Sequence, residues 1–441
     1  MFGYALALAT RNLRRSPGLT VLMVLAIGVG VAASMTMVAV VRGLSADPIP
    51  GKSSQLFVPQ IDIWGPDAPT ANGEPQAALD YTDAAALMRQ HRASRQSALY
   101  AISASITPPA SNGDPTPIPV SGFAVGGEFF PMLEVPFHFG SGWRTDDDAR
   151  DVPVVVISDR LNRQVFGGAN SVGRSLDIDH RTYRIAGVIR DWNPRPYFFD
   201  VTDLDFHLAG PDMFVPFGYA VANGIANDSV DQCPKGGDDP GTDFARLLRS
   251  DCAWISYLVE LDDAAAVRRY REYLDAYAAG QRELGRFAWA PNNRLRDIPA
   301  FLAHAHVVPG DTRVSLLVAQ GLLLVCLLNT LGLLLTKFLR RGSEVAVRRA
   351  MGASRQAIWA QLLAEAGLIG LVGGGIGLLL TVLGVHGAGA FMPASLAAAS
   401  RIDPALLSFT VLLAVVATLL ASIYPAYRAL RVPPAWLLKA H

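Results

Sequence analysis

Residues 340–377 read RRGSEVAVRRAMGASRQAIWAQLLAEAGLIGLVGGGIG, a basic amphipathic segment joined directly to a long apolar one. Glu344 precedes Arg348 by four positions, the spacing and order at which an acidic and a basic side chain form a favourable ion pair on a helix. The sequence therefore predicts a short amphipathic helix over 343–351.

A turn and a second helix start follow this segment. Gly352 can adopt the backbone conformation that ends a helix, and the Ser354 hydroxyl can cap a new helix beginning near Arg355. The new helix runs into LLAEAGLIGLVGGGIGLLLTVLG, which is apolar enough to enter a bilayer. We predict a short helix beside a membrane that bends sharply into a spanning helix.

The run E-V-A-V-R-R-A-M-G-A-S-R-Q-A-I, followed by an acidic residue in a glycine-rich helix, resembles the signature of permeases grouped around FtsX, the lipoprotein-release permeases and the macrolide-exporter (MacB-type) proteins. The resemblance implies a coupling helix that sits in a groove of a separate or fused ATPase. An ordinary basic loop held by anionic membrane lipid is the alternative that charge alone would predict. The residues implied in ATPase coupling are Glu344, Val345, Arg348, Arg349, Met351, Gly352, Ala353, Ser354 and Arg355.

Four stretches of the 441-residue chain, which is 51% hydrophobic, are long and apolar enough to cross a bilayer. The third of them is longer than one span needs and is expected to leave the membrane near Val385. The predicted parts are a cytoplasmic interfacial helix 1–17, spans 18–42, 313–337, 358–385 and 404–427, an exterior domain 43–312, a cytoplasmic coupling loop 338–357, an exterior loop 386–403 and a cytoplasmic tail 428–441.

Lysine and arginine are distributed unevenly around these spans. Twelve lie before the first span, between the second and third, and after the fourth, whereas the opposite flanks hold Arg42, Arg313 and Arg401. Because positive charge accumulates on cytoplasmic loops, both termini are predicted to be cytoplasmic. Residues 44–310 then lie outside, with 34 acidic and 23 basic side chains and a net charge of −11. High Ala, Arg and Gly usage fits a bacterial source, and the expected location of the chain is the inner (plasma) membrane.

The first span has a competing interpretation as a cleaved signal peptide. Residues 2–13 indicate an interfacial helix, and a basic cluster follows before the apolar run. That run is long and shows no clear cleavage site, which favours an uncleaved span. A-x-R-N-L-R-R-S followed by L-A-I-G-V-G-V-A also resembles the entry to the first span in the same family.

The predicted exterior domain mixes strands and helices. Residues 152–192 indicate a buried strand, a short helix, a loop and a strand pair. This run is similar to the segment of MacB-type exterior domains where a V-V-V-I-S strand precedes a helix ending in F-G-G, and where G-R-S-L-D-I and Y-R-I-A-G-V-I form a hairpin. Residues 264–284 indicate an amphipathic helix, and Thr82 is expected to cap an earlier one. The predicted fold class is a membrane protein with four transmembrane α-helices and a large α+β domain inserted between helices 1 and 2.

Residues 168–175, GANSVGRS, match a phosphate-binding loop except that Arg174 replaces the lysine. Such a loop needs a strand before its glycines and a helix after them, so that backbone N–H groups hold the phosphate. Here a helix is predicted before and a strand after, which favours a plain turn. No cofactor is therefore expected on this chain, which is predicted to be a non-catalytic permease subunit, with ATP and Mg²⁺ on a partner ATPase.

The side chains that could hold a metal ion lack suitable spacing. Asp146, Asp147 and Asp148 are without the spaced oxygen ligands and glycine of a calcium loop. His304 and His306 have no third ligand nearby in the sequence, so a polar linker is the favoured interpretation. Basic patches alternating with aromatic residues are absent from the exterior segment. We expect neither a metal site nor nucleic-acid binding.

Residues of the third span and a cysteine pair complete the predicted set. Glu365 is the acidic residue nearest the bilayer interior, so it is expected to pair with a neighbouring span or the ATPase, unless it lies wetted at the interface. Gly373 and Gly377 form a G-x-x-x-G motif that permits close helix packing within the subunit or across a dimer. Cys233 and Cys252 both fall in the exterior segment and are predicted to form a disulfide if the compartment is oxidising.

The resemblance implies a mechanism in which two cytoplasmic ATPase subunits close on ATP and move the 343–355 helix. Spans one and two would pass this movement to the exterior domain, which pushes out a peptide, antibiotic or lipoprotein-like substrate. A second permease, identical or homologous, is expected, and a periplasmic adaptor and an outer-membrane channel are compatible partners. Two other interpretations remain open: an FtsX-like permease that regulates an exterior hydrolase without export, and an anchored exterior domain without an ATPase.

Overall fold

A computed structural model describes residues 10–11, 13, 16–44, 47–65, 73–108, 116–143, 151–204, 209–229, 231–234, 240–307, 310–391 and 404–430. The chain forms two compact units, the helical unit (Met1–Ala46 and Val308–His441) and the sheet domain (Asp47–Val307). Several predicted segments lie outside the described residues: the first part of the interfacial helix (1–9), the acidic run 146–148, most of the loop 386–403, and the tail from residue 431.

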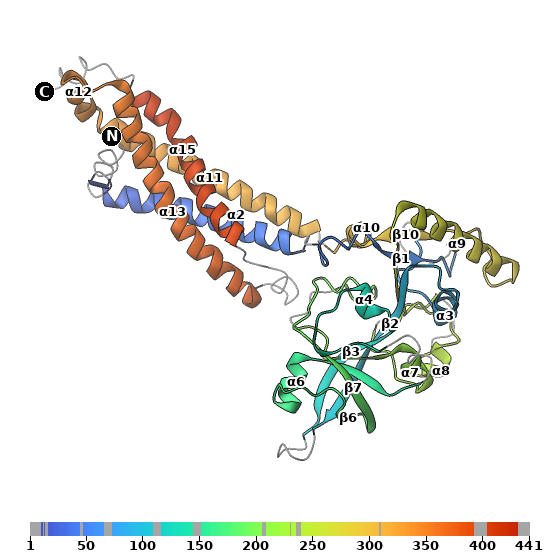
Figure 1. The fold of residues 1–441 in the computed structure, drawn as a ribbon. Helices are drawn as coiled ribbons and strands as arrows, with labels where there is room; N and C mark the ends of the chain where they lie inside the picture. Colours follow the sequence, from blue (N-terminus) through green and yellow to red (C-terminus); the bar gives the residue numbers. More distant parts are fainter. Residues whose placement is uncertain are drawn as a thin grey trace. The chain divides into compact units, whose positions relative to one another are not determined.

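Four long helices lie side by side in the helical unit, with a short helix at one end of them (Figure 1). The long helices are α2 (Pro17–Leu44), α11 (Gly310–Arg340), α13 (Arg355–Phe391) and α15 (Pro404–Leu430), and the short one is α12 (Gly342–Ala350). Each long helix contains an apolar stretch of sufficient length to cross a membrane. The predicted fold class, four spans with a large domain between the first two, is confirmed.

Glycines allow α13 to approach its neighbours closely. A Cβ added to Gly373 would lie 3.0 Å from Ile27 Cγ2 of α2, and one added to Gly377 would lie 3.2 Å from the Gly28 carbonyl oxygen. A second set of glycines on α13 faces α15: Gly370 and Gly374. Within this chain, the G-x-x-x-G motif packs against α2.

The sheet domain is built on one mixed sheet. Its strands are β1 (Leu56–Gln60), β2 (Arg95–Thr107), β3 (Ile118–Val125), β4 (Phe137–Gly140), β5 (Val154–Ser158), β6 (Ser175–Ile178), β7 (Arg181–Ile189), β8 (Met213–Pro216), β9 (Ser256–Glu260) and β10 (Arg294–Asp297). They are ordered β10-β1-β9-β2-β3-β8-β5-β7-β4, and β6 pairs with both β2 and β7. The β3–β8 and β5–β7 pairs are parallel. The predicted hairpin is β6–β7, which is antiparallel.

Within the described residues, six short helices and one long one, α9, accompany this sheet. They are α3 (Tyr81–Gln90), α4 (Phe129–Met132), α6 (Asp159–Phe166), α7 (Phe217–Ala222), α8 (Phe244–Leu247), α9 (Ala264–Glu283) and α10 (Ile298–His304). The Asp80 carboxylate caps α3 by accepting from the Asp83 backbone N–H at 2.7 Å. The expectation that Thr82 caps this helix was wrong, because the helix begins at Tyr81 and Thr82 lies inside its first turn.

The stretch that resembles a phosphate loop lies between a helix and a strand. α6 ends at Phe166, and β6 begins at Ser175. This order is the reverse of the one that a phosphate loop requires, so the interpretation of 168–175 as a turn is confirmed.

His304, one of the two histidines considered for a metal site, has its Nε2 3.8 Å from Glu74 Oε2. Among the described residues, no three His, Cys, Asp or Glu side chains are grouped so that they could hold a metal ion.

Candidate functional site

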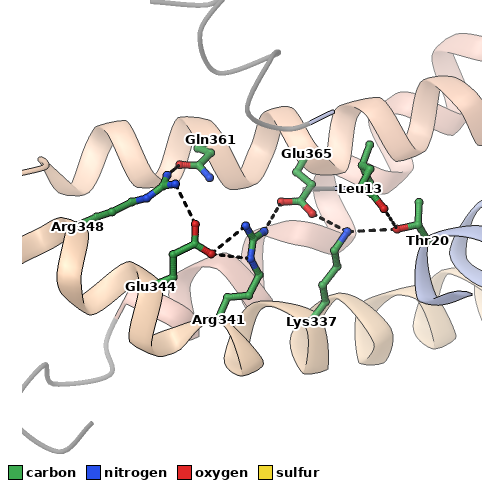
Figure 2. A network of polar contacts seen from close by, with 8 residues as sticks. All are labelled: Leu13, Thr20, Lys337, Arg341, Glu344, Arg348, Gln361 and Glu365. Carbon is green, nitrogen blue, oxygen red and sulfur yellow. Dashed lines mark hydrogen bonds and ion pairs between the residues drawn. The ribbon is translucent and has the colours of Figure 1, made fainter. Parts of the chain in front are cut away.

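A continuous chain of polar contacts links α12 to the neighbouring ends of three long helices (Figure 2). All of its members lie near the bend predicted from the sequence, between the end of α11 and the start of α13. They are Thr20 on α2, Lys337 on α11, Arg341 at the α11–α12 junction, Glu344 and Arg348 on α12, and Gln361 and Glu365 on α13.

Glu365 is fully buried on α13 and contacts two cations. Its Oε1 lies 2.5 Å from Lys337 Nζ, and its Oε2 accepts a hydrogen bond from the Arg341 guanidinium at 3.1 Å. A carboxylate that is removed from water needs such partners to remain charged. The structure therefore places its partner on the neighbouring span, as one expectation had it, and does not leave Glu365 wetted.

Glu344 connects α12 to Arg341, one of these two cations. Its Oε2 accepts from Arg341 Nε and a second guanidinium nitrogen, each at 3.2 Å, and its Oε1 accepts from Arg348 at 2.9 Å. The predicted i,i+4 ion pair of Glu344 and Arg348 is confirmed. Arg348 also donates to Gln361 Oε1 at 2.9 Å, which ties α12 to α13.

The contacts extend to the first span through Lys337. Its Nζ donates to Thr20 Oγ1 of α2 at 3.5 Å, and Thr20 donates in turn to the Leu13 carbonyl oxygen at 3.4 Å. Because Arg341 is shared by Glu344 and Glu365, a displacement of α12 changes the surroundings of a buried carboxylate inside the bundle. The arrangement can thus carry a change at α12 to α11, α13 and α2.

The bend between α12 and α13 has the chemistry that the sequence predicted. Gly352 has a φ of +95°, in the region that strains any residue with a Cβ. Ser354 Oγ accepts from the Ala357 backbone N–H at 3.2 Å and so caps α13. The predicted turn and cap are confirmed.

The residues predicted for ATPase coupling divide into a half-buried group and an exposed group. Val345 and Ala353 are half-buried and pack against the apolar core of the helical unit. Met351 is 76% exposed, and Arg349 is half-buried. We call the exposed residues within 344–355 the outer surface: Val347, Ala350, Met351, Gly352, Ser354 and Arg355.

Sequence reasoning missed several of these residues. Val347 is 51% exposed and lies one helical turn before Met351, a spacing that could have marked a shared face. Lys337, Arg341 and Glu344 follow one another at spacings of four and three positions, so the sequence also contained a charged stripe on one helix face. No local pattern indicated that this stripe meets Glu365, since that depends on how α11 and α13 are each packed on α2 and α15.

The remaining predicted residues lie away from this network. Gly373 and Gly377 lie farther along α13, where they face α2. Cys233 and Cys252 are joined by a disulfide in the sheet domain, next to a β-bridge between Gln232 and Ala253.

Two family models match the chain. Residues 20–277 match the MacB-like periplasmic core domain, and residues 316–434 match the FtsX-like permease C-terminal domain. The macrolide export ATP-binding/permease protein MacB of Escherichia coli (strain K12) is 23% identical over 388 residues, which cover 87% of this chain and 52% of that protein. MacB of Shigella flexneri has the same identity and coverage. The chain thus spans about half the length of the curated relatives that it matches.

Among solved structures, the periplasmic region of MacB from Actinobacillus actinomycetemcomitans aligns with a TM-score of 0.37 and 13% identity, covering 60% of this chain and 99% of that one. The periplasmic-core match alone takes in more than half of the 441 residues, and the permease match takes in three of the four candidate spans. The chain therefore belongs to the family of MacB- and FtsX-like ABC transporter permeases.

Proposed function

We propose that this chain couples ATP hydrolysis on a partner ATPase to movement of the sheet domain, and that this movement drives export of a substrate. The proposal rests on the observation that α12 has one bonded side and one exposed side. On one side it is bonded to Arg341 and Gln361, and on the other it presents an exposed outer surface.

The outer surface has the composition of a contact site. Val347 and Met351 are large apolar side chains that are 51% and 76% exposed, and Arg355 beside them is also exposed. An apolar patch with a charged border is typical of a surface that another protein covers. The proposed occupant is a groove of the ATPase, with two ATPase copies serving a pair of identical or homologous permeases.

Coupling requires that the ATPase hold α12 differently with and without ATP, because a partner that contacts both states equally shifts no equilibrium. Movement of Glu344 pulls on Arg341, which also binds Glu365. The displacement then reaches Lys337 and α2, and α2 leads along the chain into the sheet domain. ATP and Mg²⁺ are bound by the ATPase in this scheme.

The proposed topology places α12 and both termini in the cytoplasm and the sheet domain in the periplasm. The excess of lysine and arginine on the α12 side supports it. A peptide, antibiotic or lipoprotein-like substrate is proposed, and the macrolide export named in the MacB relatives supports the antibiotic class. A periplasmic adaptor and an outer-membrane channel would complete an export path.

A second proposed function, regulation of an exterior protein, would use the same coupling residues. The match of residues 316–434 to the FtsX-like permease domain supports a regulator that signals to an exterior hydrolase and exports nothing. Stimulation of ATP hydrolysis by a transported compound would favour export. Stimulation by an exterior protein partner, with no compound transported, would favour regulation.

Docking is tested with the full-length chain and its ATPase in membranes. Val347→Asp and Met351→Asp each place a charge on the outer surface without touching the polar network. We expect normal membrane abundance but lost co-purification of the ATPase, because a carboxylate buried without a partner is costly. Leu284→Asp is the matched control, since Leu284 is 79% exposed in the sheet domain.

Transmission is tested separately with Glu344→Lys, which places a third cation between Arg341 and Arg348. This variant should weaken the α12 contacts and reduce stimulated ATP hydrolysis while the outer surface is unchanged. If both outer-surface variants keep full ATPase binding and activity, α12 is a lipid-facing basic loop and the coupling proposal fails.

A further inference from the structure

A line of exposed residues runs along α11. This helix is the least buried of the four candidate membrane spans, and it packs mainly on α2 and α15. Its exposed side carries residues at alternating spacings of three and four, the repeat by which two helices pack side by side in a coiled coil. We call these residues the α11 seam: Leu322, Val325, Asn329, Gly332, Thr336 and Leu339.

Most of the α11 seam suits a lipid environment, but Asn329 does not. The leucines and the valine are apolar, and the Thr336 hydroxyl donates to the Gly332 carbonyl oxygen of its own helix at 3.0 Å. Asn329 is exposed, and its amide forms no hydrogen bond among the residues that the structure describes.

The position of Asn329 makes this lack of a partner costly. At about 1.5 Å per residue, Asn329 lies about 16 Å from the Arg340 end of α11, near the middle of a bilayer core that is about 30 Å thick. Acyl chains offer no hydrogen bond, so an amide that faces them loses its hydration without compensation. A partner with both a donor and an acceptor would remove this penalty.

A second copy of the same helix supplies such a partner. A carboxamide has one acceptor oxygen and two N–H donors, so two identical amides can bond to each other. In a two-fold dimer with parallel α11 helices, each seam residue faces its own counterpart. Gly332, one turn beyond Asn329, has nothing within 4 Å of an added Cβ, so the facing helix can approach closely enough for these short side chains to meet.

We propose that two copies of this chain associate through the α11 seam, with the two Asn329 amides hydrogen-bonded to each other. The pair of permeases in the proposed function, on which this inference rests, is then a pair of identical chains. A homologous permease without an amide at this position would leave Asn329 unpaired.

The α11 seam would also connect the polar networks of the two copies. Lys337 follows the seam residue Thr336 in the sequence, but its side chain is 3% exposed and is bound to Glu365. A displacement of α11 by the network of one copy therefore shifts the residues that contact the other copy.

Cysteine cross-linking locates the seam in full-length protein in its native membrane. The buried Cys326 is replaced by alanine, and a cysteine is placed at Val325 or, as the control, at Leu324. These neighbours are 53% and 58% exposed, but they point about 100° apart around the helix. On oxidation with copper phenanthroline, we expect a disulfide-linked dimer with Val325→Cys and little or none with Leu324→Cys.

Energy transfer between fluorescently tagged copies in lipid vesicles measures the strength of association. Asn329→Leu should weaken dimerisation about tenfold, and Asn329→Gln, which keeps an amide, should restore most of it. Gly332→Leu should also weaken dimerisation, because a side chain there prevents close approach. Gly375→Leu on α13, where an added Cβ likewise meets nothing within 4 Å, should not.

Dimers of Asn329→Leu that are as stable as those of the parent, or equal cross-linking at Val325 and Leu324, would overturn the proposal. Cross-linking of Val325→Cys only to a homologous permease would do the same. Neither readout depends on ATPase binding, so the α11 seam can fail while the variants at Val347 and Met351 still support coupling, and the reverse.

Discussion

Lys337 on α11 and Glu365 on α13 form an ion pair with 2.5 Å between Nζ and Oε1, and their side chains are 3% and 0% exposed. Each charge lies at the end of an apolar stretch where the other supplies its compensation. The pair therefore links two helices that pack mainly on α2 and α15 and little on each other.

Removing one member should cost far more than removing both. Glu365→Gln leaves Lys337 buried without its anion, and we expect it to destabilise the purified protein by about 3–5 kcal/mol. The double variant Lys337→Met/Glu365→Leu should unfold within about 1 kcal/mol of the unaltered chain, because an apolar pair of similar volume avoids the desolvation penalty. Thermal unfolding in maltoside micelles measures both.

The same double variant separates stability from coupling. It should fold normally but show reduced stimulated ATP hydrolysis, since Arg341 no longer links Glu344 to α13. Full coupling in a stable double variant would show that the buried pair serves folding alone.

The glycine contacts of α13 give a prediction with an internal control. Gly377→Leu places a side chain against Gly28 and Val31 of α2, whereas a Cβ on Gly375 meets nothing within 4 Å. Both changes raise helix propensity equally, so their difference reports the contact. We expect Gly377→Leu to be less stable than Gly375→Leu by about 1–3 kcal/mol in the same unfolding assay. Equal stability of the two variants would contradict close packing of α13 on α2.

In the sheet domain, two fully buried carboxylates share one guanidinium. Asp80 and Asp83 both pair with Arg286, and Tyr277 donates to Asp83 at 2.6 Å. Burial, together with the charge of Asp83, raises the pKa of Asp80 from 3.8 to about 7. Between these values the folded domain holds a proton that the unfolded chain has lost. The stability that this carboxyl contributes is therefore complete below about pH 4 and is lost as the pH rises to about 7.

Asp80→Asn should remove this dependence. The amide oxygen can still cap α3, and Arg286 is left with one carboxylate, so the variant should exceed the parent in stability at pH 8 and approach it at pH 5. Denaturant unfolding followed by tryptophan fluorescence measures the difference. Asp263→Asn changes an exposed cap of α9 and should show no such convergence between pH 5 and 8. A parallel pH profile for Asp80→Asn and the parent would count against a raised pKa.

Local signals explain how much of the site could be predicted. The short helix, its Glu344–Arg348 pair, the Gly352 turn and the Ser354 cap all depend on residues within four positions of each other. The partner of Glu365 depends instead on how the spans pack together, which no single segment specifies. For the same reason, the sequence could not tell that Ala353 packs inward while Met351 is exposed.

In the sheet domain, too, local features could be predicted from the sequence, whereas long-range pairings could not. The β6–β7 hairpin joins neighbouring segments and was readable from alternation, but the parallel β3–β8 pairing joins segments that are distant in the chain. The cap of α3 was missed because Asp80 and Thr82 are both competent caps two positions apart, and the buried Arg286 pairing favours Asp80.

The disulfide predicts that this part of the sheet domain lies in an oxidising compartment. Peptide mapping without reductant should find Cys233 linked to Cys252, with Cys326 free. Closing a loop with a sequence separation of 19 stabilises a protein by about 3 kcal/mol in the chain-entropy model, so the Cys233→Ser/Cys252→Ser variant should unfold correspondingly earlier. Two free thiols in protein taken from its native membrane would place this part of the domain in a reducing compartment.

Topology can be tested directly by reporter fusions. Fusions after Arg355 and after His441 should report the cytoplasm, and a fusion near Asn170 in the sheet domain should report the exterior, as the distribution of lysine and arginine predicts. A cytoplasmic signal at Asn170 would overturn the proposed orientation together with the export scheme.

The side chains of α2 and α13 interdigitate where the two helices meet. Their contact includes four pairs in which a branched side chain sits on a glycine: Ile27 on Gly373, Val31 on Gly377, Thr36 on Gly384, and Ile376 on Gly28. Sliding one helix along the other by a single residue, about 1.5 Å, moves every branched side chain off its glycine. Longitudinal slip is blocked unless the helices separate. In the proposed coupling, a displacement of α13 along its axis would therefore move α2 with it as far as Leu44, where α2 ends.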